Sequence, residues 1–240
     1  MLDAAGDNSL KLRQLLAGFA DLRSYIPAAI YFSINVSYAS LPLFVPTIIS
    51  ELGIFSVIQS QGLSSPPYVL AFIVILGMTW LSDRVQLRGP LVSVCAVVAA
   101  VGFLLLAVCT SPVARYVGVF LAVVIFTCVP LTLGWVSNIH ASESKRAGGY
   151  VVLSTIGQCG PVLGTNIFPA REKPFYRKGM WISFAMCLVV AVLAAVLDLW
   201  LTYDNRKMDK QDREEGVRPG DVEKHEDGAP VRQRRVRYVI

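Results

Sequence analysis

The sequence is short of charge. Only 16% of its 240 residues are Asp, Glu, Lys or Arg, whereas an average soluble domain carries roughly 25%. Most of these charges lie in the first 25 residues, in short connecting segments, or after Tyr203, so the middle of the chain is poorer still. The net charge is +5, but the sequence shows no pattern of basic and aromatic residues of the kind that binds nucleic acid. We therefore expect no nucleic-acid partner.

Residue types that support enzyme chemistry are also scarce. The chain has two histidines and five cysteines, and every cysteine falls inside an apolar segment without paired metal-ligand spacing. These thiols are therefore predicted to be free, small, buried side chains. The sequence shows no nucleophile triad and no phosphate-binding loop. We expect no enzyme activity, no cofactor and no metal site.

Long hydrophobic runs are what the chain has in abundance. It is 54% hydrophobic, with a mean hydropathy of +0.54. A membrane-spanning helix needs about 20 apolar residues, and residues 25–203 accommodate six with short loops. The sequence thus predicts an all-α membrane protein with a six-helix transmembrane domain at 25–203. The helices are expected near 26–49, 66–80, 91–108, 113–137, 150–168 and 181–201.

The flanking segments differ from this domain in composition. Residues 1–24 are polar with leucines at helical spacing, which predicts a cytoplasmic amphipathic linker. Residues 204–240 are dominated by charge and cannot bury enough apolar surface to fold alone, so a disordered cytoplasmic tail is expected.

Orientation follows from Lys and Arg near the predicted helix ends, because cytoplasmic loops collect these residues. One side holds Lys11, Arg13, Arg23, Arg84, Arg88, Lys145, Arg146, Arg206 and Lys207. The opposite side holds Arg115, Arg171, Lys173, Arg177 and Lys178. The first side has more, so both termini are predicted to be cytoplasmic, although the last outer loop is itself basic.

Polar and aromatic side chains gather on single faces of some predicted helices. The candidates for a substrate path are Tyr31, Asn35, Tyr38, Trp135, Asn138 and Gln158. Each lies near a proline or glycine that loosens the local backbone. The alternative is hydrogen bonding between packed helices, and for Asn35 the two interpretations carry similar weight. Gly157, Gly160 and Gly164 form a small-residue stripe typical of close helix packing.

The polar faces repeat along the chain. The first, second, fourth and fifth predicted helices carry polar or proline-kinked faces, whereas the third and sixth are plain. An inverted three-plus-three repeat of this kind is a common build of secondary transporters, with the substrate site at the repeat interface. The plain helices would then face lipid.

A short charged hairpin carries the first family resemblance. Asp83, Arg84 and Arg88 in W-L-S-D-R-x-x-x-R resemble the D-R-x-x-R/K-R/K motif of the major facilitator superfamily, although Thr79 stands where that family often has Gly. Further strings resemble its fungal allantoate/nicotinate permease branch, in the anion:cation symporter family. They are I-Y-F-S-I-N-V (30–36), L-F-V-P-T-I-I (43–49), P-P-Y-V-L-A-F (66–72), R-Y-V-G-V-F-L (115–121), P-L-T-L-G-W-V-S-N (130–138), K-R-A-G-G (145–149) and R-Y-V-I (237–240).

The resemblance covers the C-terminal half of such a transporter, since a full one has twelve helices. It implies proton-coupled transport of small organic anions, of the carboxylate vitamin or ureide class, across the plasma membrane. It also implies a gating role for the Asp83 hairpin, and pairing as a homodimer or with another transporter half.

Two functions remain open at this level. No Asp, Glu, Lys or Arg falls at the middle of a predicted span, where coupled anion transport would need one. The chain is therefore either a half-length or truncated transporter, or a non-transporting membrane interaction protein derived from a transporter half.

Overall fold

The computed structural model describes residues 22–50, 57–139, 143–169, 172 and 175–214. The regular structure of this part is helical. Its eight helices are α2 (Leu22–Ser50), α3 (Val57–Val85), α4 (Arg88–Val108), α5 (Pro112–Ala122), α6 (Ile125–Ile139), α7 (Glu143–Gly157), α8 (Gly160–Asn166) and α9 (Arg177–Glu214). Most of the predicted linker and tail, residues 1–21 and 215–240, lies outside the described residues.

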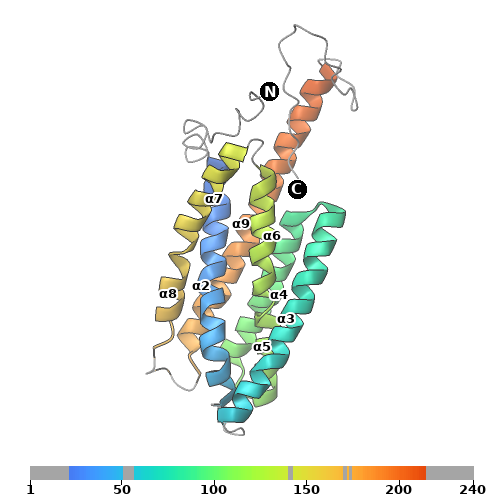
Figure 1. Ribbon diagram of the computed structural model, residues 1–240. Coiled ribbons are helices and arrows are strands. Elements are labelled where there is room, and N and C mark those ends of the chain that lie inside the picture. The colour runs from blue at the N-terminus through green and yellow to red at the C-terminus, as the bar shows by residue number, and fades with distance from the viewer. Residues whose placement is uncertain (1–21, 51–56, 140–142, 170–171, 173–174, 215–240) are drawn as a thin grey trace, which may run out of the picture.

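The helices form one elongated bundle (Figure 1). α4 and α9 pack along each other, and α2 contacts α7, α8, α9, α6 and α3. The start of α2, the hairpin between α3 and α4, and the end of α9 lie at the same end of the bundle (Figure 1). Short connections between long helices produce this antiparallel arrangement.

Four helical stretches are long and apolar enough to cross a membrane. They are Ile58–Val85, Arg88–Val108, Pro112–Ile139 and Arg177–Lys207. The described part of the chain is thus all-α with candidate membrane spans, as the sequence predicts. Six spans, and the inverted repeat, stay predictions.

Two predicted helices are interrupted. The fourth is divided between α5 and α6 at Val123 and Val124, and the fifth between α7 and α8 at Gln158 and Cys159. Pro161 follows the second interruption and has no backbone N–H, so the hydrogen-bond ladder cannot run through it unbroken.

α9 is longer than expected and reaches Glu214, past the predicted start of the tail at residue 204. The added residues include several good helix formers and no glycine or proline before Gly216. They therefore continue the helix although they bury little apolar surface.

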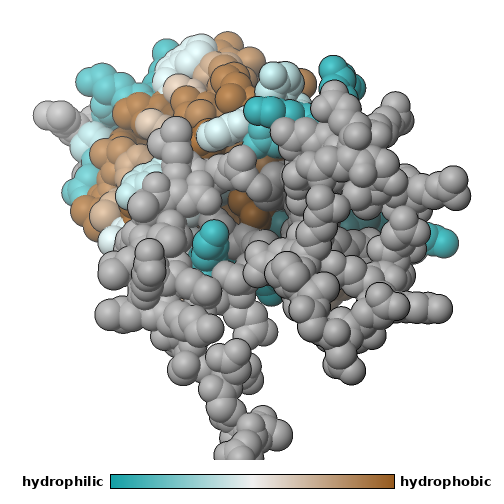
Figure 2. Space-filling view, turned by 90° about the horizontal axis from the view of Figure 1, so that it is seen from above, coloured by the Kyte–Doolittle hydropathy of each residue, from teal (hydrophilic) through white to brown (hydrophobic). Residues whose placement is uncertain are grey.

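Small side chains let α4 and α9 approach each other. Ala96, Ala99 and Ala100 of α4 are buried, as are Ala191 and Ala194 of α9. The outer face of α3 is the opposite case: Phe72, Leu76 and Trp80 are each more than half exposed. Seen from the end where α2 begins, hydrophobic residues cover much of the bundle surface visible beyond the grey atoms (Figure 2). Such a surface is suited to lipid or to another apolar partner.

Candidate functional site

Asn35 is held in a seam between helices. It lies on α2 and is buried, with only 4% of the residue exposed. Its Nδ2 donates a hydrogen bond to the backbone oxygen of Gly157 at 3.1 Å. The Tyr31 ring, one turn earlier on α2, also packs against Gly157. The structure therefore brings Asn35 and Tyr31 together at the end of α7.

The glycine stripe is the reason that this seam is so close. A Cβ atom at Gly160 would stand 2.6 Å from the backbone oxygen of Phe32, and one at Gly164 would overlap the backbone oxygen of Val36. Glycine at these positions lets α8 lie directly on the backbone of α2.

Gln158 points elsewhere. It is the first residue of the interruption between α7 and α8, and its side chain is exposed, whereas Asn35 is enclosed. The two amides therefore do not share one surface. Helical spacing agrees with this difference, because Gln158 shares its exposed side with Ser154 and Thr165, whereas the buried Gly157, Gly160 and Gly164 face α2.

Tyr38 belongs to an aromatic cluster of three helices. Its ring meets that of Phe126 on α6 edge to face, with centroids 4.7 Å apart. Phe126 meets Tyr68 on α3 in the same manner at 5.9 Å. Tyr38 remains 36% exposed. The Tyr68 hydroxyl is buried, and none of the described residues offers it a hydrogen-bond partner.

Sequence reasoning missed Phe126 and gave Tyr68 no role. Phe126 lies four residues before Pro130. Because proline has no N–H, the carbonyl of Phe126 lacks the hydrogen-bond donor that an α-helix normally provides. That spacing marks a loosened backbone and does not identify the ring, whose contacts come from α2 and α3. An aromatic cluster with a partly exposed tyrosine offers a planar ligand ring contacts and one hydroxyl donor, whereas the enclosed Tyr68 hydroxyl would reach a ligand only after the cluster opens.

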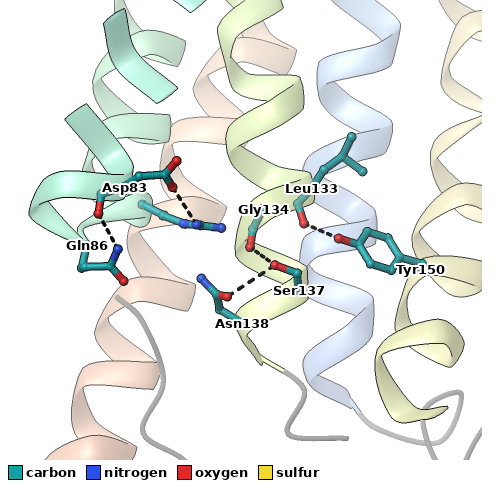
Figure 3. Close-up of polar contacts among 8 residues, drawn as sticks. Asp83, Gln86, Leu133, Gly134, Ser137, Asn138 and Tyr150 are labelled. Atoms are coloured by element: carbon teal, nitrogen blue, oxygen red, sulfur yellow. Dashed lines mark hydrogen bonds and ion pairs between the residues drawn. The ribbon is translucent and has the colours of Figure 1, made fainter. Parts of the chain in front are cut away.

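Trp135 and Asn138 lie on α6 nearer the hairpin. Trp135 is fully buried, so it contributes packing in this conformation. Asn138 is half-buried and accepts a hydrogen bond from the Ser137 hydroxyl at 3.4 Å. The same hydroxyl donates to the backbone oxygen of Gly134 at 2.6 Å (Figure 3).

The hairpin between α3 and α4 lies beside this part of α6 (Figure 3). Arg88 Nη2 and Asp83 Oδ1 form an ion pair at 3.0 Å, and the Arg88 guanidinium rests against Gly134. Arg84 lies over the Trp80 ring, 5.1 Å from its centroid. The three charged residues thus occupy different positions: Asp83 and Arg88 bridge the hairpin to α6, and Arg84 stacks on α3.

Two further charged side chains belong to the first turn of α5 and to the interior of α9. Arg115 is 2% exposed, and its guanidinium lies 4.9 Å from the Phe175 ring centroid. The Asp198 side chain of α9 packs against Gly89 at the start of α4. Within the described residues, no group of three or more His, Cys, Asp or Glu side chains is placed to hold a metal ion.

Together, the long apolar helices, the close glycine seam and the scarcity of charge within the candidate spans define an integral membrane protein of the helical-bundle class. The curated proteins that the chain resembles are transporters. It is 34% identical over 185 residues to the MFS transporter prlL of a fungal species, covering 74% of this chain and 37% of that protein.

The high-affinity nicotinic acid transporter of Saccharomyces cerevisiae is 27% identical over 196 residues, which cover 81% of this chain and 36% of that protein. The major facilitator-type transporter hxnP of Emericella nidulans is 29% identical over 212 residues, which cover 85% of this chain and 42% of that protein. These similarities support placing the chain in the major facilitator superfamily. The chain spans roughly two-fifths of the length of these relatives. No protein-family model and no solved structure matches it.

Proposed function

We propose that this chain is the C-terminal six-helix half of a transporter of the allantoate/nicotinate permease branch. In this proposal it moves small organic anions, carboxylate vitamins or ureides, with proton coupling across the plasma membrane, and both termini are cytoplasmic. The observation that carries the proposal is similarity to transporters over 74% to 85% of the chain, one of them named for nicotinic acid.

The aromatic cluster of Tyr38, Tyr68 and Phe126 is the proposed recognition surface. Ring contacts would hold a planar ligand, and the tyrosine hydroxyls would donate to its carboxylate. Neutral donors are worth about 1 kcal/mol each, less than a charged donor. They therefore suit selectivity and orientation, and the charges for capture and proton coupling would come from the facing bundle.

That facing bundle is either a second copy of the chain or another transporter half. The proposed inverted repeat places α4 and α9 outside and the remaining helices toward the partner. The packing of α4 and α9 along each other supports this arrangement.

The hairpin is proposed to latch one conformation. Asp83 holds Arg88, and Arg88 lies against Gly134 of α6, so the contact joins two helices at the bundle end. Opening that end would require Arg88 to leave Gly134.

The direct test is uptake of radiolabelled nicotinic acid by yeast that lacks its own uptake system and carries this chain at the plasma membrane. We expect saturable uptake that a protonophore abolishes and that Phe126→Ala reduces by roughly 10-fold, about 1.4 kcal/mol of lost binding. Val192→Ala, on the exposed face of α9, is the matched control and should leave uptake unchanged.

Uptake by correctly localised protein that resists the protonophore would remove the proton-coupling part of the proposal. Absence of uptake from cells that display the chain, alone or beside a twelve-helix relative, would favour an interaction protein without transport.

A further inference from the structure

Pro161 leaves one backbone carbonyl without its helical partner. In an α-helix the N–H of each residue donates to the carbonyl four residues earlier. Pro161 has no N–H, so Gly157 loses this donor. The Asn35 amide, from a helix 122 residues away in sequence, donates to that same oxygen at 3.1 Å.

Water cannot readily replace the Asn35 amide. Asn35 and Gly157 are both buried, and α8 lies directly against the α2 backbone around Gly160. A buried carbonyl without a partner is costly, and more so in a membrane. The amide therefore completes a hydrogen-bond set that the proline left incomplete.

A second pair of helices shows the same arrangement. Pro67 lies inside α3 and deprives the Leu63 carbonyl of its donor. The Tyr116 hydroxyl of α5 donates to that oxygen at 3.1 Å. Different donors and different helices thus meet the same requirement.

We propose that Asn35 and Tyr116 are positioning residues, each supplying from a neighbouring helix the hydrogen bond that a proline removes from its own. Asn35 thereby fixes the interruption between α7 and α8, which carries Gln158. Any consequence for transport rests on the proposed function, together with the sequence-based prediction that Gln158 lies on the substrate path. The consequence for stability does not.

The test exploits the proline. Asn35→Ala in the purified, detergent-solubilised full chain should lower the thermal unfolding midpoint by about 2–4 °C, the shift typical of one lost hydrogen bond at this size. Pro161→Ala restores an N–H four residues after Gly157. Asn35→Ala should therefore lower the midpoint much less when it is added to Pro161→Ala than when it is made in the unaltered chain.

The pair Tyr116→Phe and Pro67→Ala is a second cycle that keeps the aromatic ring, so it is informative even where Asn35→Ala prevents folding. Ser33→Ala is the matched control, because the Ser33 hydroxyl bonds to Ala29 within α2 and no proline is involved. Neither proline variant should change the effect of Ser33→Ala.

Simple additivity in both cycles overturns the proposal, because loss of packing would not depend on the N–H at residue 161 or 67. This result is separate from transport. If the chain shows no uptake but the midpoints are non-additive, the positioning role stands and the proposed function does not. If uptake is found but the midpoints are additive, the proposed function stands and the positioning role of Asn35 and Tyr116 does not.

Discussion

At the scale of single residues, the ion pair of the hairpin is unequal. The Arg88 side chain is 13% exposed and that of Asp83 is 62% exposed. Arg88 also packs against Gly134. Solvent therefore weakens the charge attraction, and the burial of Arg88 between two helices matters more than the pair itself.

We predict that the coupling between Asp83→Asn and Arg88→Gln, measured as a double-mutant cycle of unfolding free energies, is roughly 0.2–1 kcal/mol. In a functioning transporter, Asp83→Asn should shift the conformational balance toward an open bundle end, read by labelling of cysteines placed there. An unchanged balance would leave the hairpin as a simple topological signal.

A second residue-scale prediction concerns Tyr68. Its buried hydroxyl has no partner among the described residues, and such a group costs about 1–3 kcal/mol. Tyr68→Phe should therefore keep or raise the free energy of unfolding in urea or heat. The same variant should weaken nicotinic acid uptake several-fold. Lower stability together with normal uptake would place the hydroxyl in the structural framework.

At the scale of helices, the glycines divide by what a methyl group would meet. A Cβ at Gly164 would overlap the backbone oxygen of Val36, which cannot move without shifting α2, whereas Gly77 of α3 has nothing within 4 Å. We expect Gly164→Ala to destabilise the bundle by about 1–3 kcal/mol. Gly77→Ala, the matched control, should stabilise it by roughly 0.5–1 kcal/mol through helix propensity.

Thermal unfolding of the two variants in the same detergent compares them directly. Equal midpoints would mean that α8 does not lie on α2 in solution. The hydrogen bond from Asn35 to Gly157 would then be wrong as well.

At the scale of the whole molecule, the orientation rests on the asymmetry of Lys and Arg. Ser111 lies exposed between α4 and α5, and Leu87 lies exposed in the hairpin at the opposite end. In a chain with Cys109 and Cys159 replaced by serine, an impermeant maleimide should label Ser111→Cys from outside intact cells. It should label Leu87→Cys only after the cells are opened. The reverse pattern would invert the topology.

The sequence by itself determined that the chain is a helical membrane protein and approximately where its helices lie. Apolar runs of sufficient length leave few alternatives in a bilayer, since each helix satisfies its own backbone groups. It also marked the hairpin and the glycine stripe, because these depend on residues close together in the chain. The continuation of α9 to Glu214 departs from the composition-based boundary, because helix propensity needs no apolar face.

The tertiary structure alone decided which polar groups meet. Helical spacing put Asn35 and Tyr38 on one face of α2, but neighbouring helices turned that face into two environments, a closed seam with Gly157 and an open cluster with Phe126. The physical reason is that a local period fixes which residues share a face and says nothing of what covers it. That depends on contacts between segments about a hundred residues apart. The hydrogen bond that Asn35 of α2 donates to Gly157, whose helical donor Pro161 removes, is such a contact.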